Sequence, residues 1–435
     1  MSGSHGPSWF NLGVSASASD GINVKPREVN GYEGDRDGYR NLSAALRAGR
    51  RFASGLELDG SFLQANSHSD FDSTTGSNAN TDGVQQVAGL RARFAPLEPW
   101  RVALQAGRSE DRADAHEDGA FKSRFDTRRD SLSWQNELSL AAGHTLQLGV
   151  DHQHDEVNGS AYAEDSRDND GYFAQYLGGM GRHDWQLALR RDDNQQFGEH
   201  ETGSLAYGYA LSEALRAHAS YGSAFKAPTF NELYYPGYGN PELQAETSKS
   251  VELGLAGQHG WGHWSANVYR TQADDLISSV RVNGRSLAQG VDEARIRGLE
   301  LQLGSEWLGW QWNAGYSLMD AENRSPRSSR SGIPYYRKDL NRRPAQTVNL
   351  DVDRAFGRFS VGSTLYAQDS AYDDLENQDE LSGYASLDLR GEYRLDDEWR
   401  LQARVSNLLD ADYQTAAGYN QPGQAVYFTV RYQAL

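Results

Sequence analysis

The sequence predicts an all-β fold, a transmembrane antiparallel β-barrel in which about 20 strands are recognisable. Three observations carry this prediction. Apolar and polar residues alternate strictly in many segments, the segments have the length of tilted membrane-spanning strands (~9 to 12 residues), and the connections alternate between short and long. Glycine (45 residues) and tyrosine (23) are abundant whereas proline is scarce (11), which is typical of strands and turns.

The clearest alternation lies in residues 310–318 (WQWNAGYSL). Trp310, Trp312, Ala314 and Tyr316 fall on one face of a strand there, because successive side chains point to opposite sides. The pattern recurs in segments 215–221, 264–269, 385–391 and 426–432. A soluble β-sandwich is disfavoured because its strands are shorter and its apolar face is mainly aliphatic, whereas Trp and Tyr favour a membrane interface. A β-propeller is disfavoured because the chain shows no fixed repeat period.

The connections between these segments are expected to differ in length. Short turns are expected near residues 141–144, 181–184, 211–214, 355–358 and 395–398. Long polar stretches cover residues 107–130, 191–203, 223–248 and 320–343. Asn283-Gly284 is typical of a type I′ hairpin turn. Short periplasmic turns opposite long extracellular loops are the arrangement of transmembrane barrels. The mean hydropathy of −0.74 is compatible with it, since the lumen face and the loops are both wet.

Composition excludes several classes of protein. A net charge of −18 argues against nucleic-acid binding, which needs a clustered basic face. The absence of cysteine excludes disulfides, thiolate metal sites and cysteine nucleophiles. No apolar run reaches the ~18 to 20 residues of a membrane helix. Met1–Pro7 lacks the features of a secretory signal. We therefore interpret residues 1–8 as a tag or truncation remnant, left out of the fold, and residues 9–435 as the barrel domain.

Three segments resemble the barrel of TonB-dependent outer-membrane transporters. The first is 220–234 (SYGSAFKAPTFNELY), which continues through GNPEL at 239–243 to a strand at 251–255. The second is 294–300 (ARIRGLE), and the third is 407–413 (NLLDADY) with 418–423. The acidic early loops resemble those of the vitamin B12 (cobalamin) transporters within this superfamily.

The resemblance implies a 22-stranded barrel in the Gram-negative outer membrane, preceded by a plug domain and a TonB box. Only about 20 strands are visible here, and the plug and the first hairpin are expected to be absent. An even strand number keeps both chain ends on the periplasmic side. The implied partners are the lipid bilayer, lipopolysaccharide and the barrel assembly machinery, with TonB contacted only through the plug. Without a plug, we expect a wide passive pore or an inert barrel rather than energised uptake.

The resemblance also implies calcium bound by loop residues, carried over as Asn23, Asp35, Asp37, Asp72 and Asp82. The chemistry is reasonable, since Ca²⁺ prefers several hard oxygen ligands. Clustered carboxylates are costly unless a cation neutralises them. Asn23 departs from the carboxylate that the family has there, because it keeps an oxygen ligand and loses a charge. The alternative is that these are ordinary solvated loop residues. No organic cofactor is expected.

The expected function is transport of vitamin B12 or a related corrinoid. A ferric-siderophore or haem receptor of the same superfamily is the alternative, and a passive porin-like channel is a more distant one. The substrate-binding residues stay unassigned.

An outer-membrane enzyme would need a His held by a carboxylate near a nucleophile or water. The candidates are His152 and His154 beside Asp151 and Asp155, and His200 lies in a charged loop. None forms a convincing catalytic group, so the chain is predicted not to be an enzyme.

One basic cluster has two interpretations. Arg337-Lys338 with Arg342-Arg343 could meet lipopolysaccharide phosphates, or it could be a solvated loop.

Overall fold

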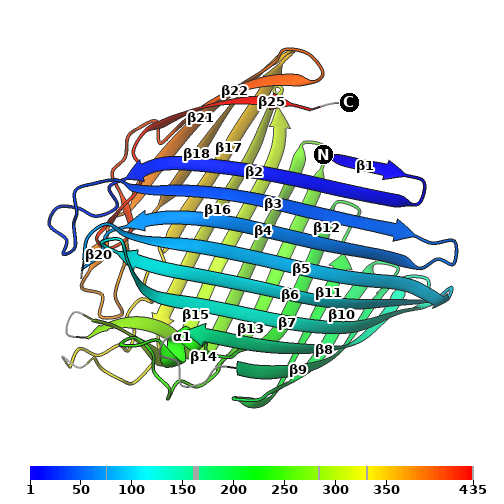
Figure 1. Cartoon of the computed structure of the whole chain (residues 1–435). Coiled ribbons are helices and arrows are strands. Elements are labelled where there is room, and N and C mark those ends of the chain that lie inside the picture. Colours follow the sequence, from blue (N-terminus) through cyan, green and yellow to red (C-terminus); the bar gives the residue numbers. More distant parts are fainter. Residues whose placement is uncertain (75, 160–165, 283–284, 330–331, 434–435) are drawn as a thin grey trace. The chain divides into compact units, whose positions relative to one another are not determined.

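The structure is a computed structural model that describes residues 1–74, 76–159, 166–282, 285–329 and 332–433 (Figure 1). It confirms the all-β prediction, because 21 strands belong to one antiparallel sheet. The chain divides into two compact units. Unit 1 comprises residues 1–205, 222–246 and 283–289, and unit 2 comprises residues 206–221, 247–282 and 290–435. No plug domain is evident among the described residues.

Unit 1 is a run of sequential antiparallel strands, seen side by side in blue to green in Figure 1. Each strand from β1 to β10 pairs with the next along the chain. Their bounds are β1 (Ser2–His5), β2 (Ser8–Ile22), β3 (Asp37–Arg51), β4 (Glu57–Phe71), β5 (Ala79–Leu97), β6 (Trp100–Glu117), β7 (Ala120–Ala141), β8 (His144–Gly159), β9 (Ser166–Met180) and β10 (His183–Asn194). The helix α1 (Phe230–Tyr234) also belongs to this unit.

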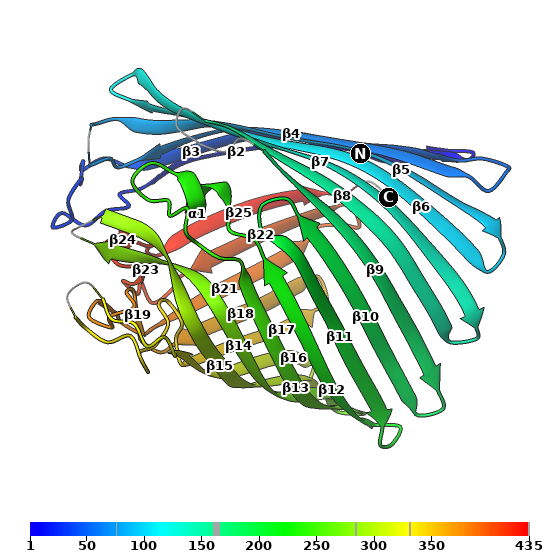
Figure 2. The same cartoon turned by 90° about the horizontal axis from the view of Figure 1, so that it is seen from below.

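Unit 2 follows the same pattern, and Figure 2 shows its strands in succession. Consecutive large strands pair antiparallel from β15 through β18 to β21, β22 and β25, and β13 pairs with β14. The unit boundaries fall within β11 (Gly198–Ala210), β12 (Leu215–Lys226), β13 (Glu246–His259) and β15 (Arg285–Trp307). The other strands are β14 (Gly262–Val282), β16 (Trp310–Asn323), β17 (Gln346–Phe356), β18 (Phe359–Gln368), β21 (Tyr384–Arg394), β22 (Trp399–Ser406) and β25 (Ala425–Tyr432). Two small hairpin sheets are made by β19 (Ala371–Tyr372) with β20 (Glu380–Leu381) and by β23 (Gln414–Ala416) with β24 (Tyr419–Asn420).

Strand register aligns the apolar side chains in rows across the sheet. Residues directly opposite each other on paired strands share a face. In unit 1, one such row is Leu58, Ala92, Leu104, Trp134, Val150 and Tyr172. In unit 2, a row runs through Leu303, Ala314, Leu350, Leu365 and Leu387. We call the face of unit 1 that carries the Leu104 row the outer face, and the opposite face the inner face.

Many apolar side chains of the outer face are open to the surroundings. Leu104 is 42% exposed and Trp134 49%, and Leu132, which lies two residues from Trp134 on the same face, is 57% exposed. Gln105 faces the inner side, where it pairs with Arg91 and Ser133. An apolar exposed face opposite a polar face is the arrangement of a lipid-facing barrel wall. Among the described residues, no helix has the length and apolarity needed to cross a membrane.

The predicted short turns are confirmed. Each predicted range lies at a short connection between two consecutive strands, as between Ala141 at the end of β7 and His144 at the start of β8. Equivalent boundaries occur between β9 and β10, β11 and β12, β17 and β18, and β21 and β22. The predicted Asn283-Gly284 turn lies outside the described residues, between the end of β14 and the start of β15.

Two predicted loops are wrong. Residues 107–130 form the extended ends of β6 and β7, joined by a two-residue turn in which Asp118 and Gly119 have positive φ (52° and 75°). Most side chains on both faces of these strand ends are polar, so the alternation of apolar and polar residues that predicts a strand is absent. Cross-strand ion pairs accompany the extension, such as Arg124 Nε to Asp114 Oδ1 at 2.6 Å. Residues 191–203 are likewise mostly strand, interrupted only between Asn194 and Gly198.

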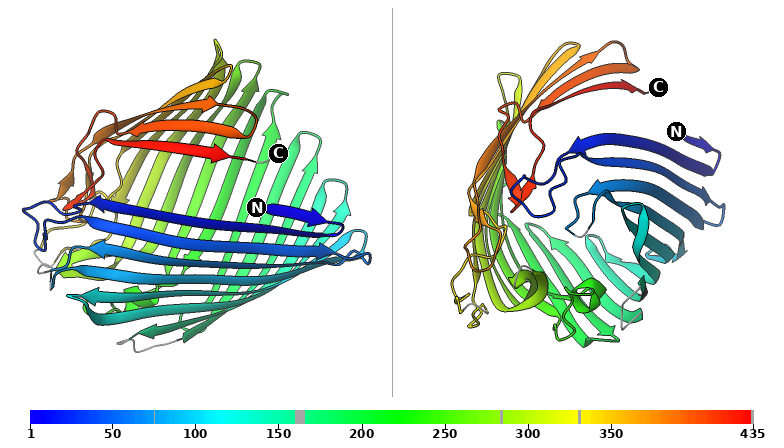
Figure 3. Two further views of the ribbon diagram at one scale, coloured as in Figure 1. Left: turned by 45° about the horizontal axis from the view of Figure 1, so that its top comes forward. Right: turned by 60° about the vertical axis from the view of Figure 1, so that its left-hand side comes forward.

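The strands and the amino-terminal segment also depart from the prediction. Several strands exceed the expected 9 to 12 residues, and β15 reaches 23. A bilayer fixes only the lipid-facing part of a strand, so pairing continues beyond it wherever loops do not interrupt. The segment 1–8 was left out of the fold, but Ser2–His5 pairs as β1 with the start of β2 (Figure 3). Apart from this short strand, the sheet contains 20 strands, as predicted.

Candidate functional site

The loops after β2 and β4 bring acidic side chains together in unit 1. Ligand oxygens of Glu33, Asp35 and Asp72 all lie within 4.8 Å of one another. The Glu33 carboxylate also accepts hydrogen bonds from the backbone N–H groups of Ser73 (3.1 Å) and Asn78 (2.8 Å), which ties the two loops together. Two separate connections between strands therefore supply one group of carboxylates. We call Glu33, Asp35, Asp37 and Asp72 the acidic loop cluster, because Asp37 also repels the Asp72 carboxylate.

Asp72 is the buried member of the acidic loop cluster. It is 8% exposed, and its Oδ2 has no hydrogen-bond partner in the described part of the chain. Burial raises the pKa of Asp72 above its ordinary value, and repulsion from Asp37 raises it further. An unpartnered buried carboxylate oxygen is costly unless another group compensates it. The side chain of Asp72 therefore has an unused acceptor directed into an acidic environment.

Lys25 provides partial compensation. This side chain is buried (6% exposed), and its Nζ donates to the backbone oxygens of Asp72 (3.1 Å) and Gly31 (3.4 Å). Within the cluster, burial and the neighbouring carboxylates raise the pKa of Asp72 overall, although the Lys25 ammonium lowers it. The set of hard oxygens and its excess negative charge fit a cation such as Ca²⁺ better than a transition metal, which prefers nitrogen or sulfur ligands.

The residues carried over for calcium are not all in this cluster. Asp35, Asp37 and Asp72 are members, and Asn23 lies at the start of the same loop, where its Oδ1 accepts from the Lys25 backbone N–H (3.3 Å). Asp82 is on β5 instead, with its Oδ1 2.7 Å from His68 Nδ1.

Glu33 is a member of the cluster that was not predicted from the sequence. The dense acidic run at 33–37 was a signal for it, but only the fold brings Glu33 to Asp72.

A second feature of unit 1 is a cavity of about 580 Å³ beneath α1. Its wall comes mainly from the inner face of β4 to β9, and its cover from the N-cap residue Thr229 and the start of α1. Its lining includes Phe125, Arg129, Asp155, Arg167 and Phe230.

Arg167, on β9, connects the wall of the cavity to the residues that cover it. This guanidinium donates to the Pro228 backbone oxygen (2.9 Å) and lies 4.9 Å from the Phe230 ring centroid. The carboxylate of Asp155 forms an ion pair with Arg167 (4.0 Å from Oδ2 to the guanidinium) and a shorter one with Arg129 (2.6 Å from Oδ1 to Nε). The first transporter-like motif therefore encodes a loop held over an inner-face cavity of ligand-binding size.

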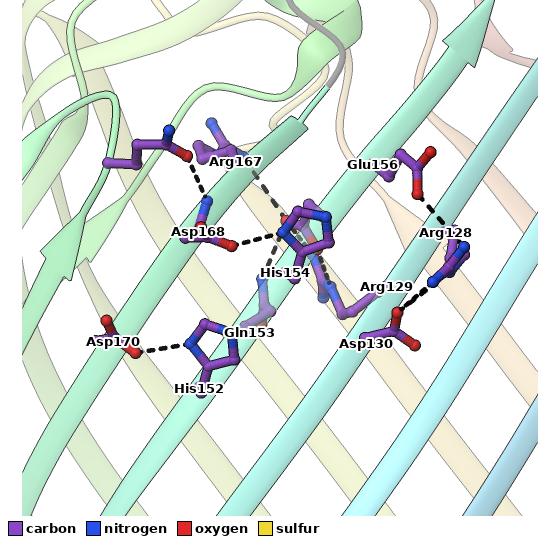
Figure 4. A network of polar contacts seen from close by, with 12 residues as sticks. Arg128, Arg129, Asp130, His152, Gln153, His154, Glu156, Arg167, Asp168 and Asp170 are labelled. Carbon is purple, nitrogen blue, oxygen red and sulfur yellow. Dashed lines mark hydrogen bonds and ion pairs between the residues drawn. The ribbon is translucent and has the colours of Figure 1, made fainter.

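The hypothetical enzyme site is not assembled. Asp151 and Asp155 are sequence neighbours of His152 and His154, but alternation places them on the inner face, where they bind Arg190 and Arg129. The histidines face outward and meet other carboxylates (Figure 4). His200 stacks on Phe225 at 3.7 Å between ring centroids, as a packing residue would.

The basic cluster predicted from the sequence lies in unit 2. There, Arg342 Nε forms an ion pair with Asp373 Oδ1 at 2.6 Å.

Comparison with known sequences identifies the family. Residues 6–408 match the family model described as TonB dependent receptor-like, beta-barrel. The vitamin B12 transporter BtuB of Photobacterium profundum is 29% identical over 448 residues, which cover 98% of this chain and 69% of that protein. The BtuB of Vibrio cholerae is 27% identical over 443 residues, with the same shares covered.

Comparison with solved structures agrees on the fold. The ferric enterobactin receptor of Pseudomonas aeruginosa superposes with a TM-score of 0.80 at 18% identity, over 98% of this chain and 75% of that one. The copper transporter OprC gives a TM-score of 0.80 at 17% identity, over 98% and 76%. These identities are low, so the superpositions establish the architecture alone. Together with the sequence match, they mean that the chain belongs to the TonB-dependent receptor-like β-barrel family.

Proposed function

We propose that this chain is the barrel of an outer-membrane transporter for vitamin B12 or a related corrinoid. The observation that carries the proposal is the similarity to vitamin B12 transporters along 98% of the chain. The acidic loop cluster adds support, because it gathers residues carried over from the same family. Energised uptake through TonB is proposed only for a protein that also contains the plug.

We propose further that the acidic loop cluster holds Ca²⁺, with Glu33, Asp35, Asp37 and Asp72 as the carboxylates and Asn23 as a neutral oxygen donor. The buried Asp72 Oδ2 without a partner supports this assignment. When bound, the cation would neutralise the carboxylates. Glu33, through its bonds to the backbone after β4, would then hold both loops in one arrangement for the substrate.

The cavity beneath α1 is the place where we propose that part of the substrate rests. It combines aromatic rings, Phe125 and Phe230, with the paired charges of Arg129 and Asp155. Large ligands are bound by mainly apolar surfaces with a few oriented polar groups. This composition suits a corrinoid, which carries many amide groups on a flat ring system.

Binding measurements on the detergent-solubilised protein test both proposals. Calcium titration calorimetry should detect one site that is weakened at least about tenfold in Asp72→Asn, because that substitution removes a buried charged ligand. Glu28→Gln is the matched control, since Glu28 lies on the same loop, is exposed and is outside the cluster. Cyanocobalamin should bind more tightly in Ca²⁺ than in a chelator.

The outcomes separate the alternatives. Equal cyanocobalamin affinity with and without Ca²⁺ would remove the role of the cluster while leaving the transporter assignment open. Binding of a ferric catecholate, with no cyanocobalamin binding, would replace the corrinoid proposal by the siderophore-receptor alternative. Binding of neither ligand, with a large ungated conductance in planar bilayers, would favour the passive channel.

A further inference from the structure

Two histidines lie one above the other on the outer face of β8. His152 and His154 are two residues apart, so both side chains point to the same side of the strand. His152 is directly opposite Leu132 of β7, which places the pair next to the exposed apolar rows. Their side chains are 49% and 37% exposed. The pair is therefore accessible from outside the sheet.

Both rings are oriented by carboxylates of the neighbouring strand β9. The Nδ1 atom of His152 is 2.8 Å from Asp170 Oδ1, and that of His154 is 2.6 Å from Asp168 Oδ1. Carboxylates only accept hydrogen bonds, so each Nδ1 carries the proton. In the neutral ring this leaves the lone pair on Nε2, and the carboxylate makes that nitrogen a stronger donor to a metal.

The second ring nitrogen of each histidine is uncommitted. Within the described residues, neither Nε2 takes part in a hydrogen bond or ion pair with another group of the protein. Figure 4 shows both rings bound on the β9 side, with the other nitrogen directed away from the aspartates and toward β7. The pair therefore presents two Nε2 atoms on one strand face, each with its tautomer fixed by an aspartate.

The surroundings favour a cation over an anion. Asp130 of β7 lies directly opposite His154, and Glu156 follows on the same face of β8. The carboxylates near the two histidines are Asp130, Glu156, Asp168 and Asp170, and the guanidinium groups among them are Arg108 and Arg128. Both arginines already bind Asp130. The patch thus has excess negative charge and little capacity for a phosphate.

We propose that His152 and His154 form an outward-facing site for a divalent transition-metal ion, with Asp170 and Asp168 as positioning residues. Imidazole nitrogen is a ligand for Zn²⁺, Ni²⁺ and Cu²⁺, whereas Ca²⁺ and Mg²⁺ take oxygen ligands. Two protein ligands leave coordination positions open for water or for a ligand from outside. The site does not depend on the transport proposal, because it shares no residue with the acidic loop cluster or with the cavity.

Zinc titration calorimetry on the detergent-solubilised full chain tests the site. The wild type should bind Zn²⁺ with a component that His152→Ala or His154→Ala each removes or weakens more than tenfold. Asp168→Asn and Asp170→Asn should weaken binding about 10- to 100-fold, as loss of an orienting carboxylate does. His68→Ala is the matched control, because both ring nitrogens of His68 already contact aspartates, at 2.7 Å and 3.2 Å.

A second measurement avoids reliance on substituted protein. Cu²⁺ bound to the wild type should show hyperfine coupling to two imidazole nitrogens in electron paramagnetic resonance, and excess Ca²⁺ should leave that signal unchanged. The proposal is overturned if Zn²⁺ affinity is the same in the His152→Ala/His154→Ala double variant as in the wild type. Loss of binding in His68→Ala alone would equally overturn it, by placing the metal on β4.

Discussion

At the scale of single residues, the family motifs mark positions where the backbone has no space for a side chain. Gly298, in the second transporter-like motif, is in the interior of β15. A Cβ at this position would lie 2.7 Å from the Leu318 backbone oxygen and 2.7 Å from the Tyr269 hydroxyl. The glycine therefore allows the tyrosine of β14 to lie across β15, which gives this position of the motif a packing role.

Substitution of this glycine should therefore be destabilising. Gly298→Ala is expected to cost about 1–3 kcal/mol, as overpacking does, because one contact is with backbone that has little freedom to move. Gly13→Ala is the control, since no atom lies within 4 Å of a Cβ built there. Denaturant unfolding of the protein in lipid vesicles measures both. Equal stability of the two variants would contradict this account of Gly298.

At the scale of elements, the segment before α1 shows how a short helix is stabilised. Thr229 and Glu232 form a capping box, with the Glu232 N–H donating to Thr229 Oγ1 (3.2 Å) and the Thr229 N–H donating to Glu232 Oε2 (2.7 Å). A five-residue helix has too few internal bonds to persist alone. Its cap and the packing of Arg167 on Phe230 therefore determine whether the cavity stays covered.

Loss of the cap should open the cover. Thr229→Ala is expected to destabilise α1 by about 0.5–2 kcal/mol, and Thr229→Ser should keep most of the stability because its hydroxyl can still accept. Hydrogen exchange of residues 229–235 reports the difference. Equally fast exchange in the serine and alanine variants would show that the threonine methyl group, which both variants lack, holds the helix rather than the hydroxyl cap.

At the scale of the whole molecule, the alternation of faces determines which environment each residue meets. Leu104 and Gln105 are adjacent in β6, but Leu104 belongs to an exposed apolar row and Gln105 to the polar inner face. The apolar outer side chains make a surface that water would solvate poorly. This surface is consistent with membership of a family of outer-membrane barrels.

The two faces should tolerate charge very differently. Leu104→Arg is expected to cost about 2–4 kcal/mol when the protein folds into lipid, the range found for Arg on the lipid face near the bilayer centre. Gln105→Arg should change the free energy of folding little, because the arginine side chain would lie on the polar inner face. Folding into vesicles across a denaturant series measures both. A larger penalty for Gln105→Arg would reverse the assignment of the faces.

The sequence alone could predict the elements of this fold because their signals are local. A period of two along each strand gives the apolar face, as in 310–318, and turn chemistry marks hairpins such as 141–144. The local signal fails where both faces are polar. Residues 107–130 were therefore predicted as a loop, although cross-strand ion pairs such as Arg124 with Asp114 accompany a hairpin there.

The sequence by itself thus determined the fold class, the strand faces and most short turns, and it showed that the early loops are acidic. The tertiary structure alone decided which side chains meet. Pairing register brings Asp170 and Asp168 to the two histidines of β8 in place of their sequence neighbours, and loop folding adds Glu33 to Asp72 while Asp82 stays with His68. These partners lie on different strands and loops, so no periodicity within one segment can specify them.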